Sequence, residues 1–139
     1  MTIKQLSIFI ENKSGTLIKV LDILSKGGIQ IIASTVADTQ DYGIYRVLCN
    51  HPTQAFLMLR EAGINVQLTD VIALSIDDEP GRAAQAVSTR SAAGVSILYM
   101  YSFLWKGKGV LILRTNPVEK AQEVITIHKM SLLTEIAFV

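Results

Sequence analysis

The strongest constraint on the fold of this chain is a repeat of 66 residues. In residues 10–17 an alternating apolar segment ends at a polar turn that contains Gly15, and an amphipathic segment follows. Residues 76–83, which contain Gly81, show the same pattern. Other positions recur at the same spacing: Gly28 and Gly94, Gly43 and Gly109, Asn50 and Asn116. The 139 residues therefore divide into two copies of one unit, and we predict domains at residues 1–70 and 71–139.

The first copy shows the pattern of four strands and two helices. Apolar residues alternate, as they do in half-buried strands, along residues 3–11, 29–39, 42–50 and 65–70. They recur at helical spacing along residues 16–26 and 52–62. The order β-α-β-β-α-β predicts an α+β fold of the ferredoxin-like type, repeated twice. In this fold two helices cover one face of an antiparallel four-stranded sheet.

Details of the two helices follow from the same spacing. Glycines end them, at Gly27-Gly28 for the first and at Gly63 for the second. In the first helix a stripe of four apolar residues is expected to face the sheet: Leu17, Val20, Leu21 and Leu24. Pro52 suits the first turn of the second helix.

The second copy repeats this order along the chain. Strands are predicted at residues 71–77, 95–105, 109–115 and 132–138, and helices at residues 81–93 and 117–129. The strand at residues 97–105 is apolar on both faces, with Tyr101 and Phe103 on one and Leu98, Met100 and Leu104 filling the other. A sheet with helices on one side only does not need two apolar faces. We therefore expect the open face of the second copy to pack against another sheet, in the same chain or in a second copy.

The composition excludes several classes of function. The formal net charge is +1, and the aromatic strand lacks the interleaved Lys and Arg of sheets that stack nucleic-acid bases, so no nucleic acid is expected as a partner. No run of 18 apolar residues is present, and we expect no membrane partner. A single cysteine, Cys49, excludes an internal disulfide and fits a reducing compartment. The sequence therefore predicts a cytoplasmic protein.

Groups that could perform catalysis are sparse. His51 and His128 lie outside any spacing typical of metal ligands, and Cys49 falls in a predicted strand, where a buried thiol is inert. The consecutive acidic residues 77–79 precede a predicted helix, where carboxylates are stabilised in any case. We predict that the protein is not an enzyme and uses no metal or cofactor.

The duplicated turns carry a resemblance to a known family. Residues 11–17 and 77–81 are similar to the polar, Arg or Pro, Gly, small, Leu signature of ACT domains, and residues 28–31 and 94–97 are similar to that family's Gly-Val-Asn-Ile entry into the second strand. The chain thus resembles a tandem pair of ACT domains over nearly its whole length. ACT domains are regulatory modules that bind amino acids between the first turn of one domain and the second strand of a partner domain.

The resemblance implies a ligand site made from both repeats, and its candidate residues are Asn12, Lys13, Ser14, Gly15, Thr16, Leu17, Gln30, Asp78, Gly81 and Ser96. The first turn is the better site for an amino acid, because its Gly15, Thr16 and Leu17 N–H groups can donate hydrogen bonds to the ligand carboxylate. In the second turn Pro80 removes a donor and the preceding acidic residues oppose that carboxylate.

These features predict a non-catalytic, regulatory protein that binds a small molecule, a free amino acid, and forms a homodimer. An enzyme of amino-acid metabolism is a further possible partner. The alternative is a scaffold or regulatory subunit without a working ligand site, which docks a partner enzyme through its apolar sheet face.

Overall fold

The computed structural model describes residues 2–11, 13–38, 42–76, 88, 96–116 and 132–133. Contacts divide the chain into two units. Lys4–Thr69 form most of one, which we call the N-terminal unit, and residues from Asp70 onward form most of the other, the C-terminal unit. The predicted domain boundary between residues 70 and 71 stays a prediction.

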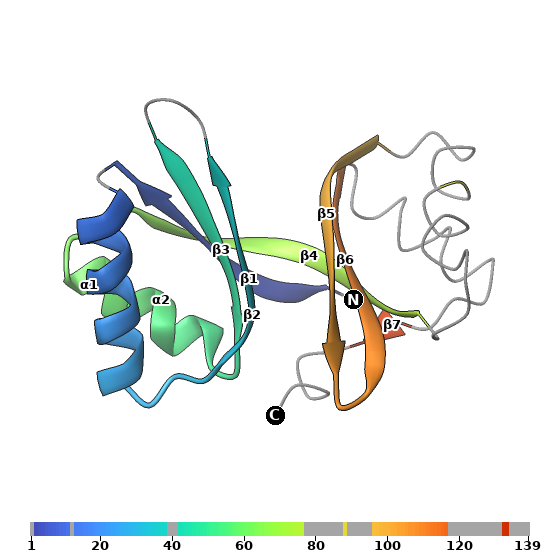
Figure 1. Ribbon diagram of the computed structural model, residues 1–139, viewed down its shortest axis with the longest axis horizontal. Helices are drawn as coiled ribbons and strands as arrows, with labels where there is room; N and C mark the ends of the chain where they lie inside the picture. Colours follow the sequence, from blue (N-terminus) through green and yellow to red (C-terminus); the bar gives the residue numbers. More distant parts are fainter. Residues whose placement is uncertain are drawn as a thin grey trace. The chain divides into compact units, whose positions relative to one another are not determined.

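The N-terminal unit has the predicted order of elements. These are β1 (Ile3–Ile10), α1 (Lys13–Lys26), β2 (Ile31–Asp38), β3 (Gly43–Cys49), α2 (Pro52–Glu61) and the first part of β4 (Val66–Ile76). The strands lie in the order β2-β3-β1-β4, and β3 pairs antiparallel with both β1 and β2. Both helices lie on one side of these strands (Figure 1). The predicted ferredoxin-like fold is therefore confirmed for this unit.

The core of the N-terminal unit lies between the helices and the sheet. Alternate residues of β1 and β3 contribute to it together with both helices, and its largest fully buried members include Leu6, Ile8, Ile10, Leu24 and Leu59. The predicted stripe of α1 is partly wrong, because Leu21 is exposed. Each helical residue turns the side chain by about 100°, so Leu21 lies to one side of Val20 and Leu24, and Ile23 packs against the core instead.

Both helices of the N-terminal unit end as the glycines predict, with one hydrogen-bonding motif. After α1, Gly28 has φ +70°, its N–H donates to the Ser25 carbonyl at 3.1 Å, and the Ile29 N–H donates to the Leu24 carbonyl at 2.9 Å. After α2, the N–H groups of Gly63 and Ile64 repeat this pair of bonds. A residue with positive φ turns the chain back, so that the N–H groups after the helix bond to its last carbonyls. Glycine adopts this conformation easily, which explains why a glycine ends each helix.

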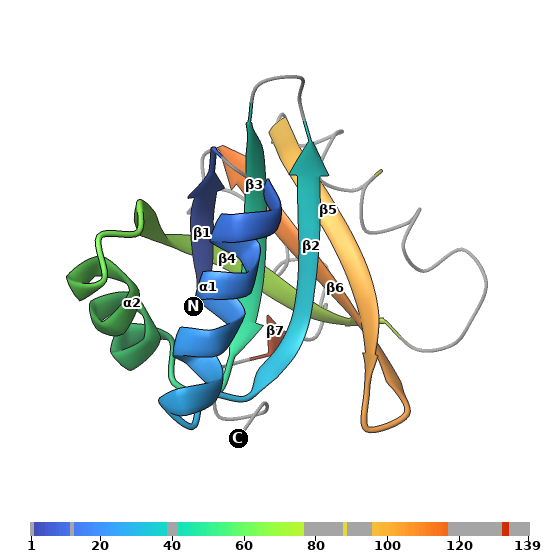
Figure 2. The ribbon, with the colours of Figure 1, turned by 60° about the vertical axis from the view of Figure 1, so that its left-hand side comes forward.

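The C-terminal unit contains the second part of β4, β5 (Ser96–Trp105), β6 (Lys108–Asn116) and β7 (Leu132–Leu133). β6 pairs antiparallel with both β4 and β5, and β7 pairs with β4. Lys106 and Gly107 form the two-residue turn that joins β5 to β6, and both have a positive φ, 51° and 77° (Figure 2). The helices predicted at residues 81–93 and 117–129 and the rest of the last strand lie outside the described residues, apart from residue 88 in a helix.

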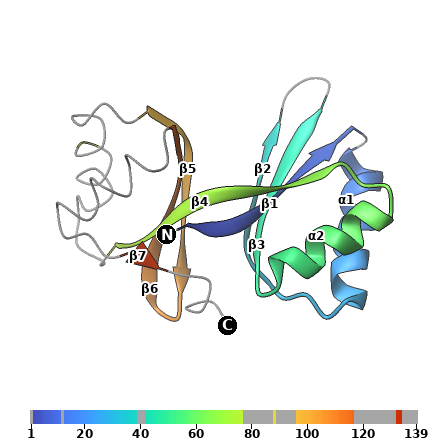
Figure 3. The same ribbon diagram turned by 180° about the vertical axis from the view of Figure 1, so that it is seen from behind.

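β4 differs from the prediction, which placed two strands at residues 65–70 and 71–77. The structure has one continuous strand, Val66–Ile76 (Figure 3). No glycine or proline interrupts this segment, and its alternation keeps one phase from Val66 to Ile76. A boundary between repeats in sequence therefore does not end the strand.

Residues on both faces of β6 are buried in the C-terminal unit. On β6, Val110 and Ile112 share a face with Phe103 and Tyr101, while Leu111 lies on the other, and all three β6 residues are buried. One side of β5 is exposed in the single chain, and its packing against another sheet stays a prediction. Leu98, Met100 and Leu104 do not fill a core but are exposed by 58%, 48% and 71%. β5 is an edge strand, so its side chains receive cover from one neighbouring strand only.

Candidate ligand-binding site

The candidate residues of the first repeat lie at the start of α1. Lys13, Ser14, Gly15, Thr16 and Leu17 form its opening turns. Gly15 is exposed, and Thr16 and Leu17 are half-buried. The remaining residue of this turn, Asn12, and the second-repeat candidates Asp78 and Gly81 lie outside the described residues.

The helix begins earlier than predicted, which changes the expected donors. α1 starts at Lys13 rather than at Thr16. Within an α-helix each N–H bonds to the carbonyl four residues before it, so Thr16 and Leu17 lie too far inside the helix to present their N–H groups to a ligand. The first four N–H groups of a helix lack an intrahelical acceptor, and those of Lys13 and Ser14 are among them. The prediction of a donor cluster at Thr16 and Leu17 is corrected accordingly.

The electrostatics of this helix end favour an anion. The first turn contains no acidic residue. Helix N-termini carry a partial positive charge equivalent to roughly half an elementary charge. Glu11, exposed just before the helix, is the nearest described acidic residue in sequence. A carboxylate aligned with the helix axis can therefore bind at this turn.

Gln30 is exposed, but its main chain is already engaged. Its N–H donates to Asn50 Oδ1 at 3.0 Å, and the Asn50 N–H donates to the Gln30 carbonyl at 3.2 Å. Only the side-chain amide of Gln30 is left to contact a ligand. Reasoning from the sequence did not assign Asn50 a role, although its recurrence as Asn116 was a signal. In the second repeat Ser96, an exposed candidate residue, pairs across the sheet with Asn116.

We expect Asn50→Ala to lower the free energy of unfolding by about 0.5–1.5 kcal/mol, the net contribution of a typical hydrogen bond. The loss arises because the Gln30 N–H would exchange a fixed acceptor for water. Urea denaturation measures it. Asn65→Ala is the matched control, since the Asn65 side chain is exposed. Equal losses for the two variants would contradict the role given to Asn50.

One unit does not bring all its own candidate residues together. α1 has 14 residues, and at 1.5 Å per residue it is about 20 Å long. Its first turn lies at one end and Gln30 follows its other end, as Figure 2 shows. A site that combines the turn with a residue such as Gln30 or Ser96 therefore needs a contribution from a different domain.

An aromatic pair lies beside the candidate turn. The rings of Phe9 and Tyr42 stack with centroids 4.8 Å apart and an interplanar angle of 29°. Phe9 is at the end of β1, and the register Ile10↔Gly43 places Tyr42 next to the segment that leads into α1. This pair was not identified from the sequence, because only the β1–β3 register brings the two rings together.

No catalytic or metal-binding cluster emerges in the part of the chain that the structure describes. No three His, Cys, Asp or Glu side chains group there as metal ligands would. Cys49 is buried in the core, as predicted, and His51 is an exposed residue that precedes α2. None of the described helices has the length and apolar composition needed to cross a bilayer.

Comparison with known proteins identifies the class to which this fold belongs. The model of the ACT domain pair family matches residues 1–138, and the chain belongs to that family. The predicted resemblance is thereby confirmed. No curated protein matches the chain in sequence.

Two solved structures illustrate the relationship. Protein BT0572 from Bacteroides thetaiotaomicron is 38% identical, with a TM-score of 0.90 over 96% of this chain and 92% of that one. The regulatory subunit of aspartate kinase from Thermus thermophilus, in its ligand-free form, is 15% identical, with a TM-score of 0.60 over 89% of this chain and 91% of that one. The second likeness shows a shared fold.

Proposed function

We propose that this ACT domain pair is a non-catalytic regulatory protein that binds a free amino acid at the first turn of α1. The observation that carries the proposal is a helix N-terminus with an exposed Gly15 and no acidic residue in its first turn. The turn occupies the position where the family resemblance places the ligand. Its donors suit the carboxylate, and a polar side chain at Asn12 suits the ammonium group.

The second domain is expected to contribute the other wall of the site rather than a second turn. Pro80 lacks an N–H, and the acidic residues 77–79 would repel a carboxylate. We propose that residues around Gln30 or Ser96 of a neighbouring domain contact the bound amino acid. Gln30 would do so through its side chain, because Asn50 occupies its N–H.

A homodimer would supply that neighbouring domain. α1 separates the first turn from Gln30 of the same unit by about 20 Å. Apolar side chains are exposed on α1 and on β2. Ile18 and Leu21 on α1 and Val36 on the edge strand β2 are 67%, 40% and 49% exposed. Burying such side chains favours association. Light scattering at saturating ligand should give the mass of two chains, and a single-chain mass would contradict this assembly.

A screen of the twenty amino acids by thermal denaturation tests the proposal. At about 100 times its Kd, a specific ligand should raise Tm by on the order of 10 °C. The effect should grow with ligand concentration, because only the folded protein binds. A related amino acid without this effect is the internal control. If no amino acid changes Tm at any concentration, amino-acid sensing is wrong for this chain.

The second candidate is a scaffold that binds an enzyme of amino-acid metabolism in the cytoplasm. The exposed Leu98, Met100 and Leu104 on β5 favour it, because edge strands with apolar side chains are common docking surfaces. The two candidates differ in one measurement. A scaffold copurifies with a stoichiometric enzyme and shows no thermal response to amino acids, whereas a sensor shows the thermal response by itself.

A further inference from the structure

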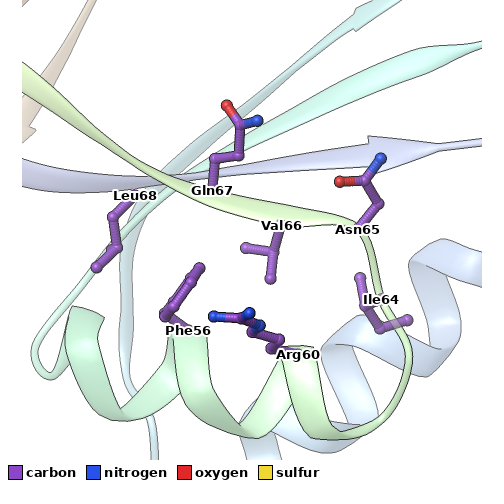
Figure 4. Close-up of a pocket in the computed structure, with 7 residues that line it drawn as sticks. All are labelled: Phe56, Arg60, Ile64, Asn65, Val66, Gln67 and Leu68. Atoms are coloured by element: carbon purple, nitrogen blue, oxygen red, sulfur yellow. The ribbon is translucent and has the colours of Figure 1, made fainter.

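A groove in the N-terminal unit lies between α2 and the start of β4 (Figure 4). Its volume is about 580 Å³, and its walls are Phe56, Arg60 and residues 64–68. Cavities of this size hold small organic ligands or a few residues of peptide.

The groove follows the edge of the strand. Five consecutive residues line it, although side chains alternate between the two faces of a strand. Val66 and Leu68 point toward α2, whereas Asn65 and Gln67 point away from it (Figure 4). Asn65 and Gln67 therefore line the groove with their main chain.

The main chain of this edge is open to a further strand. The Asn65 carbonyl accepts a hydrogen bond from the Phe9 N–H of β1 at 2.9 Å. Because successive residues of a strand direct their N–H and C=O groups to opposite sides, those of Val66 and Leu68 are directed away from β1. Pairing of β4 with β6 begins only at Ile72, and no described strand pairs with Val66–Thr69 on that side.

Arg60 supplies a positive charge at the groove. Its Cζ lies 5.8 Å from the centroid of the Phe56 ring, one helical turn before it, and the residue is exposed. Within the described parts of the chain no carboxylate lies at ion-pair distance from Arg60; the ion pair found there joins Lys26 to Asp22. A guanidinium held against a ring in this way is suited to bind a carboxylate from another molecule.

The segment at the edge lacks the features that usually prevent pairing. Residues 64–69 contain no charged residue, proline or glycine, and their apolar members Ile64, Val66 and Leu68 alternate toward the helix side. Natural edge strands without such protection recruit an added strand. Pairing with a second copy of this segment would bring no carboxylate to Arg60, since the segment has none.

We propose that this groove binds the C-terminal segment of a partner protein as an added β-strand along β4. The peptide main chain pairs with Val66 and Leu68, its terminal carboxylate binds Arg60, and an apolar side chain enters beside Phe56. Main-chain pairing supplies affinity in such complexes, and the pocket supplies specificity. The groove residues differ from those proposed to bind an amino acid at α1.

Selection from a display library of random C-terminal heptapeptides on the full chain tests the inference. A selected peptide is then synthesised as the free acid and as the C-terminal amide, and binding is measured by fluorescence anisotropy. Amidation and Arg60→Gln should each weaken binding about 10-fold or more, as expected for loss of a charged hydrogen bond. Glu61→Gln, which changes the neighbouring exposed charge, should leave it unchanged.

Several outcomes would overturn the proposal. One is a selection that enriches no peptide, and another is a selected peptide whose affinity is the same for acid and amide and for Arg60→Gln. A third is self-association of the chain that Arg60→Gln or Leu68→Lys abolishes and no peptide inhibits, which would make a second copy the occupant. Circular dichroism confirms that each variant is folded.

Discussion

Replacing Gly109 with alanine should lower the free energy of unfolding by about 1–3 kcal/mol, the usual cost of overpacking a filled site. A Cβ at this position would lie 2.6 Å from the Ile76 carbonyl oxygen and 3.0 Å from Ile76 Cγ1. Ile76 and Gly109 are paired across β4 and β6. The obstructing atom is therefore part of the main chain in a hydrogen-bonded ladder and cannot move aside without disturbing that ladder.

The repeat provides a matched control at Gly43, which corresponds to Gly109. A Cβ at Gly43 would meet the Ala37 carbonyl oxygen at 3.4 Å, close to ordinary contact, and no atom of its partner Ile10 comes nearer. Gly43→Ala should thus be near neutral, since alanine also restricts the unfolded chain. Urea denaturation of both variants measures the difference. Equal losses of unfolding free energy in the two variants would show that the contact with Ile76 does not restrict position 109 to glycine.

Replacing Asn12 with alanine should weaken amino-acid binding by about 1–3 kcal/mol, because a charged group of the ligand would lose its polar partner in the site. Asp78→Ala should change affinity little or strengthen it slightly, since it removes a negative charge that repels the ligand carboxylate. Titration calorimetry with the amino acid found by thermal screening gives both affinities.

The two variants assign the site by contrast. Unchanged affinity in Asn12→Ala together with lost binding in Asp78→Ala would place the ligand at the second turn. Equal weakening in both would mean that both turns are occupied. The thermal screen does not depend on which residues bind the ligand. A wrong choice of turn therefore changes the calorimetry of the two variants, whereas a wrong function abolishes the thermal response to amino acids.

Features set by neighbours in the sequence could be predicted from the sequence alone. The 66-residue register identified the duplication, and alternation along β1 and β3 identified the inward face of the N-terminal sheet. Gly28 and Gly63 marked the helix ends, because a left-handed residue at that point is a local requirement.

Other features depend on which segments meet in space. The continuity of β4 depends on the partners on its two sides, and the exposure of Leu98, Met100 and Leu104 depends on β5 being an edge strand. Gln5, a polar residue of β1, is completely buried, with its Nε2 donating to Ser7 Oγ at 3.2 Å.

The candidate site likewise has some features that follow from neighbours in the sequence and others that depend on the tertiary structure. Its glycine turn and polar residues follow from a local motif, so the sequence alone pointed to α1. Tertiary structure alone showed that α1 starts at Lys13, that Asn50 holds the Gln30 N–H, and that a groove with Arg60 follows the edge of β4. The physical reason is that periodicity and turn chemistry act over a few residues, whereas hydrogen-bond partners and strand edges are determined by contacts between distant parts of the chain.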